Sequence, residues 1–143
     1  MIREKSVGII VFRRQSSEGL QYLLLYHGGN YWNFAKGHVE PGESEIETGL
    51  RELSEETGLA GIKLIEGFRQ QTDFFFKETH NGRNDLIKKD FIMYLGEAPA
   101  TAEPRISHEH NGYAWFDFKT AQKLLRFKNL KEILAEADSL AKR

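Results

Sequence analysis

The sequence predicts an α/β or α+β domain in which helices cover a β-sheet. Short apolar runs rich in β-branched residues recur along the chain, and polar turns bound them as they bound strands. One helical segment lies between two groups of strands, and two amphipathic helical segments follow the last strand. This order is typical of a layered domain. We expect residues 1–143 to form a single domain, because no linker or internal repeat interrupts them.

The composition is that of an ordinary globular protein, with 40% hydrophobic and 29% charged residues. The formal net charge of -1 weighs against nucleic acid or an anionic membrane as a partner. The absence of cysteine excludes thiol chemistry and cysteine-ligated zinc, and it fits a reducing compartment. Neither a signal peptide nor a membrane-spanning run is recognisable, so we expect a soluble cytoplasmic protein.

The first part of the chain predicts a β-hairpin, a long loop and a helix. The loop is rich in glycine, and Ser44 or Glu43 is placed to begin the helix. Gly58 supplies a C-terminal stop for the same helix. The expected elements are strands over 6–12 and 20–27, a loop over 28–44 and a helix over 45–57.

The second part predicts another hairpin, a loop, a short strand and two helices. The Asn81-Gly82 pair is a hairpin signal between two strand-like runs. The first of these runs reads either as one long strand or as two short ones. The expected elements are strands over 61–78, 86–98 and 113–118, a loop over 99–112, and helices over 119–127 and 130–142.

Three glutamates lie close together in the stretch RELSEETGL, at residues 51–59. On a helical wheel Glu52, Glu55 and Glu56 share an arc of about 100°. An apolar stripe, which we expect to be buried, lies beside them and consists of Ile46, Leu50 and Leu53.

This acidic face is unfavourable to the helix that carries it. Like charges four residues apart cost a few tenths of a kcal/mol, and acids in the last turn oppose the helix dipole by about 0.3–1 kcal/mol. Gly49, in the helix interior, lowers the stability of the helix by about a further 1 kcal/mol relative to alanine. Three carboxylates on one face suit a hard cation such as Mg²⁺. A solvated face, partly neutralised by Arg51 and Lys63, is the alternative.

The spacing around the glutamates resembles a known motif. Residues 37–59 read GHVEPGESEIETGLRELSEETGL, which fits the Nudix box G-x5-E-x7-R-E-U-x-E-E-x-G-U, where U is apolar. This resemblance implies the Nudix fold, an α/β sandwich with a mixed sheet between helices. It also implies hydrolysis of a diphosphate linked to another moiety with the help of a divalent ion. This ion is usually Mg²⁺, and Mn²⁺ can substitute for it.

The resemblance assigns roles to the residues of the box and to one glutamate beyond it. Arg51 would orient a ligand glutamate, and Glu43 would be its structural partner on the loop. The implied metal ligands are the Gly37 carbonyl, Glu52, Glu55, Glu56 and Glu109. Which glutamate serves as general base stays open. The implied catalytic residues are Arg51, Glu52, Glu56, Glu109 and His38.

Longer blocks resemble the asymmetrically cleaving diadenosine tetraphosphate hydrolases, which form ATP and AMP. These blocks are YWNFAKGHVEPGE, LIEGF, RISHEHNGYAWF and RFKNLKEIL. By this resemblance Lys36, His38 and Lys89 would face the phosphates. Tyr113 and Phe74 would stack on adenine, although both lie on predicted strands and also suit a core.

Two departures from this pattern leave the substrate open. Ala35 stands where a proline is common before the lysine-glycine pair, and Phe74 stands where tyrosine is frequent. The alternatives are another linked diphosphate, such as a nucleoside triphosphate, a 5' RNA end or a diphosphoinositol phosphate, or a silent nucleotide sensor. The expected partner is a small nucleotide, and the sequence leaves the oligomeric state undetermined.

Overall fold

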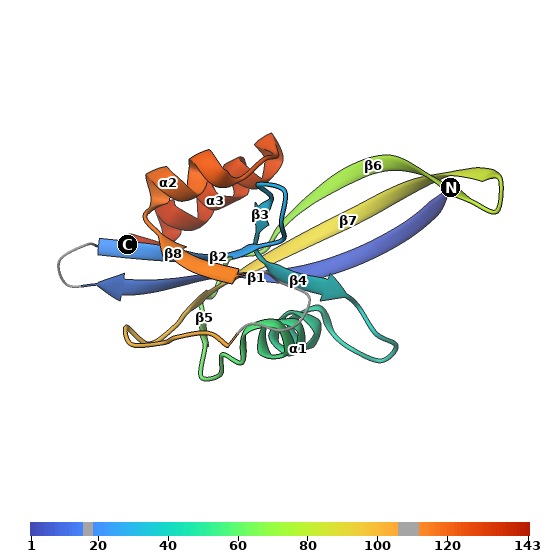
Figure 1. Cartoon of the computed structure of the whole chain (residues 1–143). Helices are drawn as coiled ribbons and strands as arrows, with labels where there is room; N and C mark the ends of the chain where they lie inside the picture. Colours follow the sequence, from blue (N-terminus) through green and yellow to red (C-terminus); the bar gives the residue numbers. More distant parts are fainter. Residues whose placement is uncertain (16–18, 106–111) are drawn as a thin grey trace.

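The structure is a computed structural model that describes residues 1–15, 19–105 and 112–143, without the side chain of His80 (Figure 1). These residues form eight strands and three helices, with one helix between two groups of four strands and two helices after the last strand. The strands are β1 (Ile2–Gln15), β2 (Gly19–Tyr26), β3 (Trp32–Asn33), β4 (Ala35–His38), β5 (Lys63–Leu64), β6 (Gln70–His80), β7 (Arg83–Glu97) and β8 (Gly112–Phe116). The helices are α1 (Glu45–Thr57), α2 (Phe118–Leu124) and α3 (Lys128–Ala141).

Strand β1 organises a single mixed sheet. It runs parallel to β7 from the Ile2–Ile87 pair to the Phe12–Glu97 pair. Its first half pairs antiparallel with β4 and its second half with β2, so it changes partner midway. The other pairings, β2 with β3 and β8 and β7 with β5 and β6, are antiparallel. The predicted hairpin of the first two strands is confirmed, and the first strand begins earlier than predicted.

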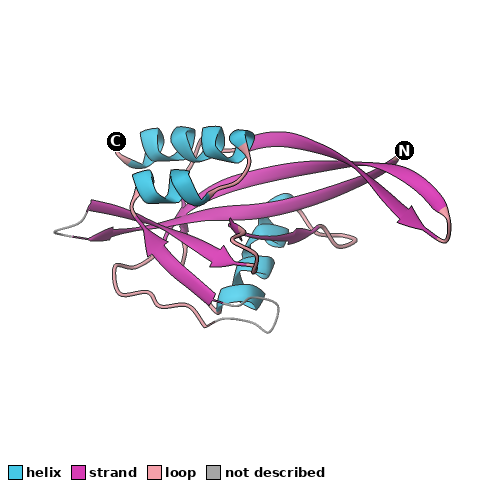
Figure 2. Ribbon diagram, turned by 45° about the horizontal axis from the view of Figure 1, so that its top comes forward, coloured by secondary structure: helices cyan, strands magenta, loops and turns pink. Residues whose placement is uncertain are grey.

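Helices cover both faces of this sheet, which confirms the predicted α/β/α sandwich. Helix α1 lies on one face, and α2 and α3 lie on the other (Figures 1 and 2). Because successive strand residues point to opposite faces, β1 supplies both cores. Ile10 and Phe12 pack with the α2 and α3 side, whereas Ile9 and Val11 pack with the α1 side around Leu53.

Helix α1 begins and ends where the sequence predicts, but it buries a different stripe. Ser44 caps its N-terminus in a capping box with Glu47, and Gly58 ends it with a left-handed φ of 70°. The prediction that Ile46 and Leu50 are buried is wrong, since they are 41% and 37% exposed.

The cause is a close approach of α1 to the sheet at Gly49. A Cβ added there would lie 3.1 Å from Cγ1 of Ile9. The helix therefore turns its glycine, Leu53 and Glu56 toward the sheet, and it leaves the two larger side chains toward solvent. Close packing against β1 explains a glycine that is locally unfavourable in a helix.

Two further expectations are refined by the structure. The run 61–78 forms two strands, β5 and β6, rather than one. The predicted loop 28–44 contains the short strands β3 and β4. The turn between β6 and β7 is confirmed at Asn81 and Gly82, which have φ of 50° and 78°. No helix in the described part of the chain is long and apolar enough to cross a membrane.

A buried hydrogen bond ties α3 to the sheet. The Tyr22 hydroxyl donates to Oδ1 of Asp138 at 2.6 Å, and Lys142 lies 2.8 Å from the other carboxylate oxygen. Tyr22 and Asp138 are both buried. Burial and this bond raise the pKa of Tyr22.

We expect Tyr22→Phe to lower the free energy of unfolding by about 1–3 kcal/mol, because it leaves a buried carboxylate oxygen without its donor. Urea denaturation monitored by circular dichroism measures the change. The matched control is Tyr26→Phe, whose hydroxyl accepts a 3.2 Å bond from the exposed Asn30 amide. We expect the control to change stability by no more than about 0.5 kcal/mol. Equal effects of the two substitutions would contradict the role of the Asp138 bond.

Candidate active site

The guanidinium of Arg51 joins helix α1 to the loop before it. Its Nε donates to Oε2 of Glu43 at 2.6 Å, and its Nη2 donates to Oε1 of the same carboxylate at 3.0 Å. Nη2 also donates to the His38 carbonyl at 3.0 Å. Nη1 donates to Glu52 at 2.9 Å and to Glu55 at 3.2 Å. One planar cation therefore fixes the loop and two of the clustered glutamates together.

The Glu43 carboxylate accepts further hydrogen bonds on the loop side of this network. Its Oε1 accepts hydrogen bonds from the Thr48 hydroxyl at 2.8 Å and from the Glu40 amide at 3.0 Å. The bonds from Arg51, and then that from the Glu40 amide, lower the pKa of Glu43 to about 2. Glu43 is therefore held as an anion by its neighbours, as a structural partner of Arg51.

Glu56 is held differently from the other two glutamates, because it points inward. It is only 6% exposed, and its Oε2 accepts a 2.9 Å hydrogen bond from the backbone amide of Lys36 on β4. The next residue, Gly37, lies against Glu52 so closely that an added Cβ would overlap that carboxylate. Only glycine leaves room there, which explains its place beside the acidic helix.

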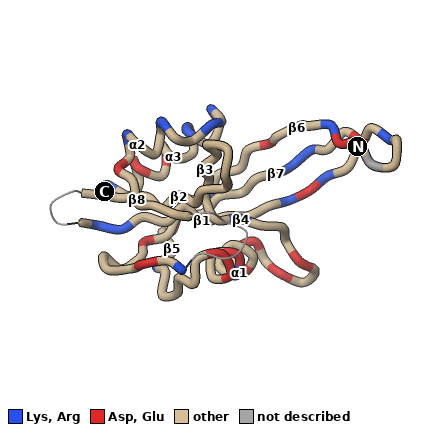
Figure 3. Tube along the Cα trace, viewed as in Figure 1, with Lys and Arg blue, Asp and Glu red and all other residues tan. Residues whose placement is uncertain are grey.

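The acidic side chains gather on α1 and the loop before it (Figure 3). Among the residues that the structure describes, no three acidic or histidine side chains already converge as metal ligands. Glu52 and Glu55 instead contact Arg51. The donor atoms still suit a hard divalent cation, because the carboxylates and the Gly37 carbonyl supply only oxygen. Glu109, the remaining predicted ligand, lies outside the described residues.

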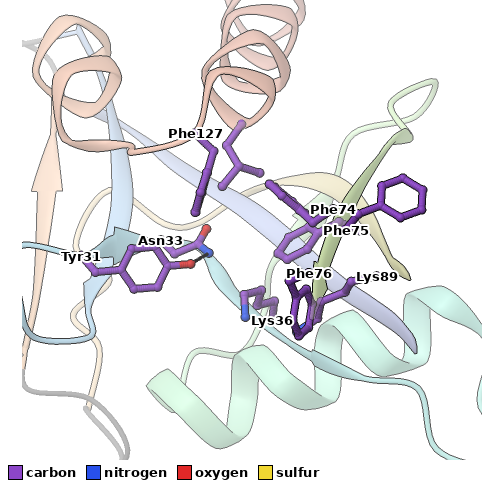
Figure 4. Close-up of a pocket in the computed structure, with 10 residues that line it drawn as sticks. Tyr31, Asn33, Lys36, Phe74, Phe75, Phe76, Lys89 and Phe127 are labelled. Atoms are coloured by element: carbon purple, nitrogen blue, oxygen red, sulfur yellow. Dashed lines mark hydrogen bonds between the residues drawn. The ribbon is translucent and has the colours of Figure 1, made fainter. Parts of the chain in front are cut away.

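A cavity of about 330 Å³ opens on the opposite face of the sheet, beside α3 (Figure 4). Its walls are mainly aromatic. The rings of Phe74 and Phe127 lie 5.2 Å apart at 66°, and Phe74 also meets Phe91 edge to face. Tyr31 and Phe76 line the same cavity. Such a cavity offers flat apolar surfaces to a planar ring.

Two lysines line this cavity and connect it with the acidic helix. The Nζ of Lys36 lies 5.4 Å from the centre of the Phe91 ring. Burial, and then the nearby charge of Lys89, lower the pKa of Lys36, while Glu56 and Glu52 raise it. The side chain of Lys36 therefore lines the cavity, and its backbone amide bonds the buried glutamate. Together the two lysines make the cavity suitable for an anionic ligand.

The comparison with known proteins decides the family. Residues 2–137 match the NUDIX domain family. The chain belongs to this family. The Arg51 network and the carboxylates on α1 are therefore its Nudix box, and the protein is a Nudix hydrolase. Nudix hydrolases generally use divalent metal ions, in agreement with the oxygen donors on α1.

Related proteins of nearly the same length match most of the chain. The asymmetrical bis(5'-nucleosyl)-tetraphosphatase of Sus scrofa is 37% identical over 142 residues, with 92% of this chain and 91% of the pig protein covered. The Rattus norvegicus protein of the same name is 34% identical over the same shares. The crystal structure of a C. elegans Ap4A hydrolase binary complex has a TM-score of 0.82 at 22% identity, covering 97% of this chain and 98% of that one. The structural likeness supports the fold.

The predicted substrate residues of this Nudix hydrolase fall into two groups. Lys36, Phe74 and Lys89 line the cavity together. His38 is exposed at the end of β4, where its carbonyl accepts from Arg51. Ala35, at the place where proline is common, is a buried strand residue paired with Ile9 of β1.

Tyr113, the expected partner of Phe74 on adenine, lies on the other face of the sheet from Phe74. It packs with the α1 side of the sheet, and its hydroxyl donates to Glu103 at 2.9 Å. Arg13 donates to the same carboxylate at 3.0 Å. The cause is strand alternation, because Tyr113 and Trp115 of β8 point to the α1 face, away from the cavity. Glu103 and Tyr113 thus connect the chain on either side of residues 106–111.

Most of the cavity residues were missed in the sequence, among them Phe127, Tyr31 and Asn33. Phe127 lies between the two C-terminal helices within the block RFKNL, which carried the resemblance without marking this ring. Tyr31 and Asn33 come from the glycine-rich region, and the buried Asn33 amide donates to the Tyr31 hydroxyl at 2.8 Å. An aromatic residue in each block was the available signal, but only the fold brings Tyr31, Phe74 and Phe127 together.

We expect Glu43→Gln to weaken the dependence of stability on acid pH. The pKa of Glu43 is about 2, below its ordinary value of 4.5, so its stabilisation is fully present above pH 4.5 and is lost as the pH falls toward 2. The urea midpoint of the unchanged protein should therefore fall more steeply over this window than that of the variant. Glu66→Gln, at an exposed loop position, is the control. Parallel curves for Glu43→Gln and the unchanged protein would contradict the assignment.

Proposed function

We propose that this Nudix hydrolase cleaves diadenosine tetraphosphate asymmetrically to ATP and AMP, with Mg²⁺ as its cofactor. The observation that carries the proposal is the position of Lys36. Its side chain lines an aromatic cavity, while its backbone amide bonds Glu56 of the acidic helix. A nucleoside in the cavity would thus extend its phosphate chain toward the box. The pig relative, 37% identical over 92% of this chain, supports the choice of substrate.

In this proposal the adenine ring stacks on the aromatic wall of the cavity, against Phe127 with Phe74 beside it. The two rings contact each other edge to face at 5.2 Å, so the base packs on this pair rather than between its members. Lys36 and Lys89 neutralise part of the phosphate charge. Tyr31 presents its hydroxyl at the cavity wall, where the Asn33 amide holds it. Other nucleosides offer the same flat face, so the ring pair alone selects for a base rather than for adenine.

The Gly37 carbonyl, Glu52, Glu55 and Glu56 would hold the divalent ion, with Glu109 as a further ligand or the general base. The ion would neutralise the polyphosphate and polarise its phosphoryl oxygens. Arg51 positions Glu52 and Glu55 through its two short bonds to them. His38 would donate a hydrogen bond to a phosphate.

The cytoplasm is the proposed compartment, because a chain without cysteine suits a reducing environment. The proposed partner is a small nucleotide. The net charge of -1 weighs against a long RNA as substrate, since such a ligand favours a basic surface.

One assay separates the candidate functions. The purified protein is incubated with diadenosine tetraphosphate, ATP or 5'-triphosphorylated RNA, with Mg²⁺, with Mn²⁺ or with chelator, and the products are resolved by ion-exchange chromatography. The proposal predicts ATP and AMP from the dinucleotide in the presence of metal ion. Turnover of RNA or ATP alone would contradict the proposed substrate and identify that molecule as the substrate instead. Nucleotide binding without any turnover would support a silent sensor.

We expect Glu56→Gln to lower kcat by about 10²- to 10⁴-fold, as when a positioned acid or base is removed. The amide oxygen can still accept from the Lys36 amide, so the fold should survive. Circular dichroism and the urea midpoint check the fold. The control is Glu66→Gln, an equal change at an exposed loop position, which should retain full activity. Near-normal turnover of Glu56→Gln would rule out its role as ligand or base.

We expect Phe127→Leu to raise KM for the dinucleotide by about 10-fold or more, because stacking of a base is worth about 1–3 kcal/mol. Its effect on kcat should be smaller than that of Glu56→Gln. Phe127→Tyr keeps the ring and is the matched control, with KM within a few-fold of the unchanged protein. If leucine and tyrosine act alike, Phe127 does not stack on the base.

A further inference from the structure

Strand β6 forms an open edge of the sheet. Its one strand partner among the described residues is β7, and it runs along the outer side of the long hairpin, away from α1 (Figure 1). Two aromatic residues in the middle of this edge are exposed, Phe75 at 61% and Phe76 at 37%. An edge strand presents unpaired amides and carbonyls, and large apolar side chains beside them favour pairing with another strand.

We propose that β6 is the interface of a symmetric homodimer, in which it pairs antiparallel with β6 of a second copy about a two-fold axis at Phe75. This register is self-complementary. Asp73 lies opposite Lys77 of the partner subunit, and Lys77 opposite the partner's Asp73. Phe75 meets its own copy, and Phe74 meets the partner's Phe76. Opposite charges and aromatic pairs are the cross-strand neighbours that stabilise antiparallel pairing.

The strand pattern selects this register. A two-fold axis perpendicular to the sheet keeps each residue on the same face in both copies, so only residues of equal parity can lie opposite each other. Moving the axis by one residue places Phe75 opposite Asp73 or opposite Lys77. Both alternatives separate the two charges, so neither is self-complementary in this way.

The charges on β6 are available for this pairing. Lys77 is exposed and forms no ion pair within the part of the chain that the structure describes. The residue opposite Lys77 on β7 is the apolar Leu86. Asp73 is 40% exposed and lies 3.7 Å from Lys88, so it retains a side open to a second cation. A second copy would supply the opposite charge that Lys77 lacks in the described structure.

The interface would adjoin the cavity. Phe74 and Phe76 line the cavity, and they lie at the same edge that pairs. In the proposed register, Phe76 of the partner subunit lies beside Phe74. The second copy would thus extend the aromatic wall of the cavity, whatever ligand the cavity takes.

Charge reversal tests the register. Multi-angle light scattering or sedimentation should give twice the 16.5 kDa chain mass for the unchanged protein at high concentration. Lys77→Asp and Asp73→Lys should each be monomeric, because each places like charges opposite each other. Their mixture should form a heterodimer, because all four charges are then complementary. Lys119→Asp, an equal change at an exposed position on α2, should leave the dimer intact.

Disulfide trapping is a second test, and it needs no change of charge. The chain has no cysteine, so Phe75→Cys introduces a single thiol. Opposed residues of an antiparallel pair have Cα atoms about 4.5–5.5 Å apart, within the range of a disulfide. Mild oxidation should therefore give a covalent dimer. Thr79→Cys, exposed on the same strand but far from the axis, should not cross-link.

Three results would overturn the proposal. The first is a monomeric unchanged protein at every concentration. The second is a dimer that both charge reversals leave intact, because its interface would lie elsewhere. The third is equal cross-linking of Phe75→Cys and Thr79→Cys, which indicates random collision rather than a fixed register.

Discussion

The site depends on the bonds that Arg51 forms. Its planar guanidinium supplies five N–H donors, and the structure uses them on the Glu43 carboxylate, the His38 carbonyl, Glu52 and Glu55. Without this cation, the carboxylates of Glu43, Glu52 and Glu55 would lose the positive charge that they share. A lysine could neutralise the charge, but its compact ammonium could not hold Glu43 through two parallel bonds. The loop and the helix are thus fixed relative to each other by the same side chain that positions the glutamates.

Strand β4 connects this acidic network with the cavity. Because it pairs with β1 in the middle of the sheet, its successive residues point to opposite faces. Lys36 reaches the cavity, and Gly37 faces Glu52 on α1. In the proposed function, a phosphate chain that begins in the cavity would meet the carboxylates at β4, the strand that lies between them and the cavity. The short strand was not predicted from the sequence, since its glycine-rich segment looks like a loop.

The sequence predicted the box well because its information is local. The positions of Ser44, Arg51 and Gly58 follow from spacing along one helix and its caps, and the structure confirms both ends of that helix. The buried face was predicted only in part. Leu53 is buried, but Ile46 and Leu50 are exposed, because the helical wheel does not reveal how closely Gly49 approaches Ile9. Packing partners distant in sequence decide such a face.

The cavity was harder to predict for the same reason. Its aromatic walls come from segments around residues 31, 74 and 127, which only the complete fold brings together. The position of Tyr113 shows that one residue along a strand decides which face of the sheet a side chain reaches. A shift of one residue along β8 would turn its side chain from the α1 face toward the other. Sequence alternation in this short strand could not decide between the faces, since apolar or aromatic residues occupy both.

The acidic helix and the cavity also support each other electrostatically. Burial and the charge of Lys89 lower the pKa of Lys36, whereas Glu56 and Glu52 raise it. The carboxylates therefore help to keep the half-buried Lys36 charged beside the cavity, although they are themselves unfavourable to the helix. Replacing them would weaken both the proposed metal-binding face and the positive charge beside the cavity. The local cost of clustered glutamates is thus offset twice, by Arg51 on the loop side and by Lys36 on the cavity side.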